Sequence, residues 1–207
     1  GWRDPWDPAK AIEVVNSPNT HYMHHTAHSF VGHIGAGLAA LTEGLAKKPR
    51  WTGGEPEALK KALAAAFAPE AGWGPARAMA AIREAAPRKT VTTVDSGAHR
   101  ILLSEMWECP SPRTLLQSSA LCTMGIALPL AIGHKLAQPE TPVICFTGDA
   151  GLEMVVGDLA TLRDLRLPVA VVVFVDRSLA LIEMKQRATN RPNLGVDFPG
   201  TDFPALA

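Results

Sequence analysis

The sequence has no excess of charge of either sign, because its 207 residues contain 20 Lys+Arg and 20 Asp+Glu and carry a formal net charge of +0. This balance argues against binding to nucleic acid or to a membrane through a basic surface. The chain also lacks the roughly 18 consecutive apolar residues that cross a bilayer. Its longest apolar run, Val169–Val175, has the length of a strand. We therefore expect no nucleic acid and no membrane among its partners.

Cysteine is scarce. The three cysteines, Cys109, Cys122 and Cys145, form no CxxC pair, and an odd number cannot pair completely. We therefore expect reduced thiols and a cytoplasmic location. The chain starts at Gly1 without a charged-then-apolar leader, and the pattern at Thr201–Ala207 is typical of the start of a helix. We expect a fragment of a longer polypeptide.

Apolar residues are abundant. They make up 47% of the sequence, which is enough for a substantial core. From residue 90 onward, apolar segments of strand length alternate with helical patterns. Strands are expected at Thr90–Val94, Thr114–Gln117, Pro142–Thr147 and Val169–Val175. Helices are expected at Ala98–Trp107, Gly125–Leu136, Leu152–Leu165 and Leu179–Arg187. Pro129 should kink the second of these helices or mark its first turn.

The predicted strands are apolar along their whole length instead of alternating with polar residues. This composition is typical of a parallel sheet that is covered on both faces. We therefore predict an α/β fold, with a doubly wound, mostly parallel sheet and helices on both faces. A helical and linker segment should precede it.

That preceding segment has weaker patterns. Residues 1–30 are rich in Pro, Asn, His and Trp and read as a loop or linker. A helix is expected over residues 31–47, where apolar side chains recur at helical spacing. Two Ala-rich helices should follow, at about residues 56–67 and 75–85.

Three predicted strand ends carry loops that could bind a ligand, because ligands of open parallel sheets bind at the carboxyl ends of the strands. These loops are residues 95–99, 148–151 and 176–178. Asp149 and Asp176 follow two strands joined by one helical crossover. If those strands are neighbours, about 4.8 Å apart, both carboxylates can reach one point.

Two carboxylates with backbone carbonyls form a hard-oxygen site of the kind that suits Mg²⁺, which also binds substrate phosphates. Ala150 and Gly151 are small enough for their N–H groups to approach a phosphate. The alternative is that Asp149 only caps the helix that follows it. Spacing alone leaves both interpretations open.

The order of the motifs adds a resemblance. Gly148-Asp149-Ala150, followed after the next strand by Asp176, resembles the metal and diphosphate motif of thiamine diphosphate-dependent enzymes. Residues 123–133 (TMGIALPLAIG) and 95–99 (DSGAH) are similar to two further motifs of that family, and Leu167-Pro-Val also fits. The resemblance is strongest over residues 75–186. It points to the C-terminal, diphosphate-binding domain of the acetolactate synthase and 2-keto acid decarboxylase group, and the GDA and TMG variants favour acetolactate synthase.

The resemblance implies a cofactor, thiamine diphosphate, and a metal, Mg²⁺. The implied metal ligands are the side chains of Asp149 and Asp176 and the carbonyl of Ser178. Met124 would support the bent cofactor. The implied contacts of the diphosphate and its loop are Gly97, Ala98, His99, Gly148, Ala150 and Gly151.

The resemblance also implies a larger assembly. Residues 1–50 would be the tail of a middle domain and a linker, and residues 51–207 a thiamine diphosphate domain truncated at its C-terminus. The pyrimidine-binding domain that carries the family's catalytic glutamate would be absent. We therefore expect no catalytic residue in this fragment and no turnover by the isolated chain. The whole protein should act on a small 2-keto acid, as a homodimer or tetramer with sites between subunits.

Two residues depart from the family pattern. Asp176 stands where an amide is usual, and its extra negative charge could be offset by the neighbouring Arg177. Cys122 stands where the family generally has glycine. These departures leave open a non-catalytic domain with an assembly or regulatory role, alongside a 2-keto acid decarboxylase.

Two other functions are disfavoured. A dinucleotide-binding domain would need G-x-G-x-x-G after the first strand of the sheet, which is missing. His21 with His25 and His24 with His28 have i, i+4 spacing, yet no Cys or acidic partner joins them, so a zinc site is not expected.

Overall fold

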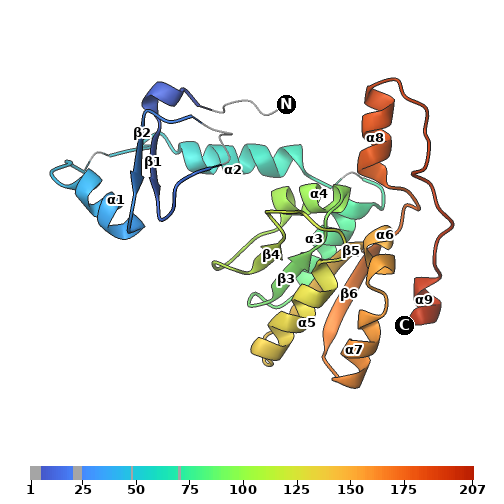
Figure 1. The fold of residues 1–207 in the computed structure, drawn as a ribbon. Helices are drawn as coiled ribbons and strands as arrows, with labels where there is room; N and C mark the ends of the chain where they lie inside the picture. The colour runs from blue at the N-terminus through green and yellow to red at the C-terminus, as the bar shows by residue number, and fades with distance from the viewer. Residues whose placement is uncertain (1–5, 21–24, 48, 70) are drawn as a thin grey trace. The chain divides into compact units, whose positions relative to one another are not determined.

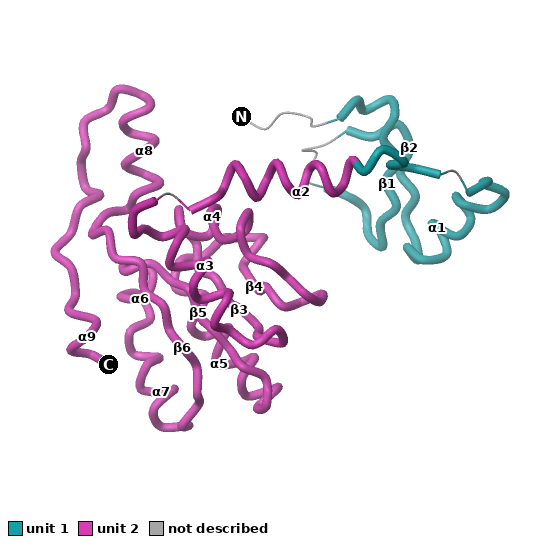
Figure 2. Tube along the Cα trace, turned by 180° about the vertical axis from the view of Figure 1, so that it is seen from behind, with its two compact units in different colours: residues 1–54 teal, residues 55–207 magenta. Residues whose placement is uncertain are grey.

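The computed structural model describes residues 6–20, 25–47, 49–69 and 71–207. The chain forms two compact units, residues 1–54 and residues 55–207, which are coloured separately in Figure 2. The proposed origin of the first unit in a middle domain stays a prediction. Among the described residues, no helix has both the length and the apolar character that crossing a membrane requires.

The first unit contains a short 3-10 turn (Pro8–Lys10), strands β1 (Ile12–Val15) and β2 (His28–Val31), and helix α1 (Ile34–Thr42). The two strands pair in parallel, with Ile12 opposite His28. The prediction of a loop through residue 30 was therefore wrong at both strands. Each is only four residues long, and Pro, Asn and His around them hide the β-branched signal.

Helix α1 is shorter than the predicted 31–47. Its last residue is Thr42, and Gly44 adopts a left-handed backbone with φ of 75°, a conformation that stops a helix. Within the unit, the apolar side chains of α1 are partly solvent-exposed, from 38% at Leu41 to 50% at Leu38. The apolar residues at helical spacing thus form a row along α1 that the described residues do not fully cover.

The second unit begins with α2 (Glu55–Ala66) and α3 (Pro75–Ala85), which confirm the two Ala-rich helices. Its sheet has the order β4-β3-β5-β6, and every pair is parallel. The strands are β3 (Val91–Val94), β4 (Leu115–Gln117), β5 (Val143–Gly148) and β6 (Val169–Phe174). The remaining helices are α4 (Ala98–Met106), α5 (Ala127–Ala137), α6 (Asp149–Met154), α7 (Asp158–Asp164), α8 (Ala180–Ala188) and α9 (Phe203–Leu206).

Successive residues of β5 point to opposite faces of the sheet, and both faces are covered (Figure 1). Val143 and Cys145 belong to a buried cluster with α5, α6 and α7. Ile144 and Phe146 belong to a second cluster with α3 and α4, in which Trp107 packs edge-on against Phe146. The doubly wound α/β prediction is confirmed.

Two helices differ in detail from the predictions. Pro129 lies in the first turn of α5, where its missing N–H leaves no bond unmade. The predicted helix 152–165 is two helices, α6 and α7, separated at Val155–Gly157. Two β-branched valines followed by glycine have low helix propensity, and Val155 instead packs against the α5 cluster.

The chain reverses its direction of travel across the sheet between β3 and β5. It passes from β3 to β4 on one side, then crosses to β5 on the other side of β3, and continues to β6. Such a switch point opens a crevice at the carboxyl ends of the two central strands. The loops after β3 and β5 therefore border the natural ligand position of this fold.

Candidate functional site

Asp95 follows β3, and its carboxylate is fully buried. It accepts hydrogen bonds from the N–H groups of Ser96 (2.8 Å), Gly125 (2.8 Å) and Ile126 (3.2 Å) and from the Thr147 hydroxyl (3.0 Å). Four donors satisfy a carboxylate that burial would otherwise destabilise. One side chain thus fixes the end of β3 to β5 and to the segment that leads into α5.

Two glycines allow this packing. At Gly151, any side chain would collide with the Asp95 carboxylate. Gly125 has a left-handed backbone (φ 82°), and a β-carbon there would lie 2.9 Å from a methyl carbon of Val155. The glycine after Met124 is therefore required both by its backbone conformation and by its neighbours.

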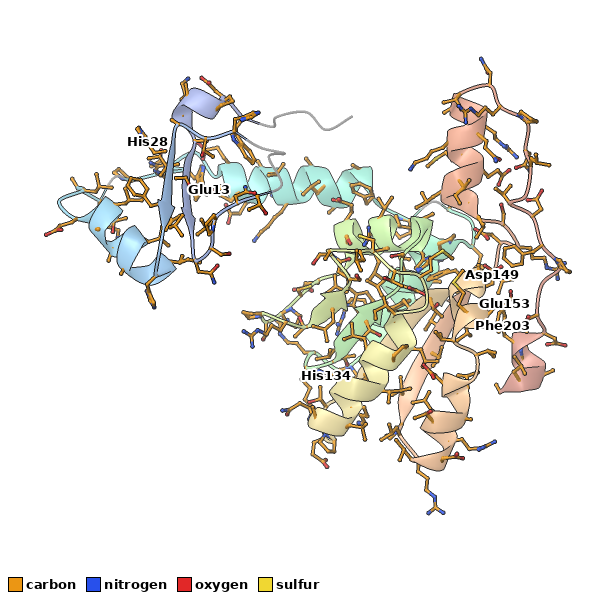
Figure 3. The ribbon with its side chains drawn as sticks, viewed as in Figure 1. Glu13, His28, His134, Asp149, Glu153 and Phe203 are labelled. Atoms are coloured by element: carbon orange, nitrogen blue, oxygen red, sulfur yellow. The ribbon has the colours of Figure 1, made fainter. Side chains whose placement is uncertain are left out.

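Asp149 is the first residue of α6 (Figure 3). Its exposed fraction is 2%. One carboxylate oxygen accepts the N–H of Ala150 at 2.8 Å. The other accepts the N–H groups of Asp176 (3.2 Å) and Arg177 (2.7 Å), which follow β6. Because β5 and β6 are neighbours, the expected meeting of these two strand ends is confirmed. Asp149 therefore does more than cap its own helix.

Asp176 is exposed and closes a turn, in which its side chain accepts the N–H of Ser178 at 3.0 Å. The segment after α8 returns to this turn. The N–H of Leu179 donates to the carbonyl of Val196 at 2.9 Å, and the N–H of Phe198 donates to the carbonyl of Arg177 at 3.2 Å. The loop that carries Asp176 and Ser178 is thus fixed both by Asp149 and by the segment after α8.

All ten residues predicted for the site line one cavity of about 510 Å³ at the carboxyl ends of β3, β5 and β6. They are Gly97, Ala98, His99, Met124, Gly148, Asp149, Ala150, Gly151, Asp176 and Ser178. Residues far apart in the sequence are therefore neighbours in space. Their individual roles stay predictions.

The cavity lining includes one half-buried imidazole ring. His99 stacks on Phe174, with ring centroids 5.7 Å apart, and its Nε2 atom is buried without a hydrogen-bond partner among the described residues. Burial lowers the pKa of His99 below 6.5, and Arg100 acts in the same direction, whereas Asp95, Asp176 and Asp149 oppose the shift. The imidazole is therefore neutral near pH 7, with one nitrogen able to accept or donate.

Cys122 also lines the cavity, and its backbone is left-handed (φ 51°). Its carbonyl accepts the Ser96 hydroxyl at 2.6 Å, and its sulfur accepts an Arg100 N–H at 3.3 Å. A left-handed backbone explains in physical terms why glycine suits this position. The thiol is accommodated by its contact with Arg100.

Some residues in and next to the cavity were not among the predicted site residues. Asp95, which is buried and does not line the cavity, was predicted only as the start of a loop, although an acid directly after a buried strand is a usable signal. Arg100 and Phe174 line the cavity, and no sequence pattern distinguishes them. Among the described residues, no cluster of three or more His, Cys, Asp or Glu side chains forms a metal site. His21 and His24 lie outside the described residues.

Comparison with known proteins identifies the class. The model of the thiamine pyrophosphate enzyme family, C-terminal TPP binding domain, matches residues 95–207. The chain therefore belongs to this family, and thiamine pyrophosphate is another name for thiamine diphosphate. The matched region contains all ten predicted site residues and excludes the first unit.

The names of individual relatives agree with this family. A probable acetolactate synthase large subunit of Methanococcus aeolicus is 34% identical over 58% of this chain and 20% of its own length. A putative thiamine pyrophosphate-containing protein, YdaP, of Bacillus subtilis is 32% identical over 64% of this chain and 23% of its length. Acetolactate synthase isozyme 1 large subunit of Escherichia coli is 35% identical over 46% and 17%. The matched part of the chain spans about a fifth of the length of these relatives. Residues 95–207 are therefore the C-terminal thiamine pyrophosphate-binding domain that defines this family.

Proposed function

We propose that this chain binds thiamine diphosphate through Mg²⁺ and belongs to a longer enzyme that decarboxylates a 2-keto acid and joins the product to an acceptor, as in acetolactate synthesis. The observation that carries the proposal is the single cavity lined by all ten predicted residues. Its position at the switch point of the sheet is where ligands of such folds bind. The names of the relatives support the choice of reaction.

The donor atoms suit Mg²⁺, since they are all oxygens. Asp149 has one oxygen that accepts a single hydrogen bond, and one oxygen of Asp176 accepts none from the described residues. The carbonyl of Ser178 would be a third oxygen ligand from the protein, and Mg²⁺ would also bind the phosphate oxygens of the cofactor. Asp149 is itself oriented by the N–H groups of the Asp176 loop, so its position does not depend on the metal.

The loop after β3 suits a diphosphate. Gly97 precedes α4 without any side-chain cap, which leaves N–H groups of the first helical turn for an anion. A β-carbon at Gly97 would lie 2.6 Å from the His99 ring, so a larger residue there would require the ring to move. Ala150 differs, since its N–H already donates to Asp149. Its contribution to the diphosphate would require that bond to be shared.

When bound, thiamine diphosphate supplies the electron-sink chemistry for cleaving and forming carbon–carbon bonds next to a carbonyl. The residues of this chain bind its diphosphate end, and Met124 lies at the cavity wall to support the rings. We infer that the proton transfer which activates the cofactor comes from a glutamate on a domain outside this chain. The partner would be a second subunit in a cytoplasmic homodimer or tetramer. The three free thiols support that location.

Calorimetric titration of the full-length protein with thiamine diphosphate tests the proposal. Binding should require Mg²⁺, and Asp149→Ala should abolish it, because the metal would lose a charged and oriented ligand. Asp164→Ala removes the same charge from an exposed side chain on α7 and is the matched control. Binding that is equal with and without metal, or unchanged in Asp149→Ala, would overturn the site. Wild-type protein that does not bind the cofactor at all would favour a non-catalytic assembly role.

A further inference from the structure

The charges that line the cavity are unbalanced. Asp149 and Asp176 both face it, with Asp95 buried behind them, and the neutral His99 adds no charge. The proposed ligand is itself anionic, and one Mg²⁺ cannot neutralise two carboxylates and a diphosphate together. Among the described residues that line the cavity, Arg100 alone is a lysine or arginine.

Arg177 does not correct this imbalance, although its position beside Asp176 suggested that it would. Its backbone is left-handed (φ 57°), and its side chain lies over Gly200, where a β-carbon would be 2.8 Å from Nε. Arg177 is absent from the described lining of the cavity. The side chain of Arg177 therefore lies against the segment that follows α8, and not in the cavity.

The guanidinium of Arg100 is held by two hydrogen bonds from Nη1, and its other N–H donors are unused by the described residues. Its Nη1 donates to the carbonyl of Ser118 at 3.0 Å and to the sulfur of Cys122 at 3.3 Å. A guanidinium has five N–H donors, and no described residue accepts from Nη2 or Nε of Arg100. Two adjacent, unused donors on a fixed guanidinium form the fork that binds two anionic oxygens at once.

We propose that Arg100 is the anion-binding cation of this cavity and that its Nη2 and Nε donate to anionic oxygens of the bound ligand. Two sources supply such oxygens in the proposed reaction: the diphosphate of the cofactor and the carboxylate of the 2-keto acid. The proposal rests on the proposed function. Arg100 supplies the positive charge in the cavity lining that Arg177, whose side chain lies at Gly200, does not supply.

The experiment uses the full-length protein and measures the affinity for thiamine diphosphate with Mg²⁺, for thiamine, and, in the cofactor-loaded protein, for pyruvate. Arg100→Gln removes the charge and should lower the affinity for one of the anionic ligands at least tenfold, the scale of a hydrogen bond to a charged group. Arg100→Lys keeps the charge but loses the fork, so its loss should be smaller. Arg177→Gln removes the same charge outside the lining and should also lose less.

The outcomes separate the possibilities. A loss for thiamine diphosphate but not for thiamine, which has no phosphate, assigns Arg100 to the diphosphate. A loss for pyruvate alone assigns it to the substrate carboxylate. Equal losses for thiamine and thiamine diphosphate would show that Arg100 only holds the Ser118–Cys122 loop, and unchanged affinities would show no role; either result overturns the proposal. Wild-type protein that fails to bind thiamine diphosphate would instead refute the proposed function, and this inference with it.

Discussion

Gly151 in α6 packs directly against the carboxylate of Asp95 at the end of β3, so closely that no side chain fits between them. Gly151→Ala should therefore force the Asp95 network apart and lower the free energy of unfolding by about 1–3 kcal/mol, the cost of overpacking a core. Urea unfolding measures this. Gly157→Ala is the control, because its backbone is helical (φ −59°) and nothing lies within 4 Å of the added carbon. Equal stabilities of the two variants would contradict the contact.

Asp176→Asn should retain the affinity for thiamine diphosphate with Mg²⁺ or tighten it several-fold. The amide keeps one oxygen for the turn with Ser178 or for the metal, and it removes a negative charge beside an anionic ligand. Titration calorimetry against Asp164→Asn, an exposed change of the same kind, measures the effect. A tenfold loss would show that the carboxylate charge is itself required.

The cysteines should react with a thiol reagent in a fixed order. Burial raises the pKa of the Cys145 thiol to about 12, despite a hydrogen bond with Thr93 that lowers it, so almost no thiolate forms near pH 8. Cys109 is exposed. Peptide mapping after brief alkylation should find Cys109 modified and Cys145 intact until the protein is denatured. Early modification of Cys145 would show that β5 opens in the native protein.

The neutral state of His99 predicts a pH dependence of stability. Because burial holds its pKa below 6.5 in the folded chain, the unfolded chain takes up a proton first as the pH falls. The free energy of unfolding should therefore decrease below about pH 6.5. His99→Phe keeps the stacking on Phe174 without a titrating group, so its stability should change less between pH 7.5 and 5.5. Identical pH profiles for the two proteins would refute the buried, neutral imidazole.

The sequence predicted the features that depend on long apolar runs. Strand β5 is buried over most of its length, and β6 is an unbroken apolar run. Once the two strands are parallel neighbours, Asp149 and the Asp176 loop must meet. The resemblance of the motifs to a known family then predicted thiamine diphosphate as the ligand. Helix α3 was equally clear, because the segment that contains its buried residue Met79 is rich in alanine and follows a break at Gly72 and Gly74.

Other features depend on geometry that the order of residues does not encode locally. The strands β1 and β2 are four residues each and partly exposed, so neither length nor burial marks them. Arg177 was expected to balance Asp176, but a left-handed backbone turns its side chain onto Gly200. Arg100, in the first turn of α4, lines the cavity instead. Which of two arginines faces a ligand is decided by backbone conformation and long-range packing.

The cavity is assembled at the ends of β3, β5 and β6, which are followed in the chain by Asp95, Asp149 and Val175 and are joined by intervening helices. A chain in which any of these strands is unpaired has no complete site, and such non-local pairings form slowly. The ligand should therefore recognise only the finished sheet. By mass action, a ligand that binds only the folded state would shift the folding equilibrium toward that state. The supply of cofactor in a cell would then influence the fraction of the protein that is degraded.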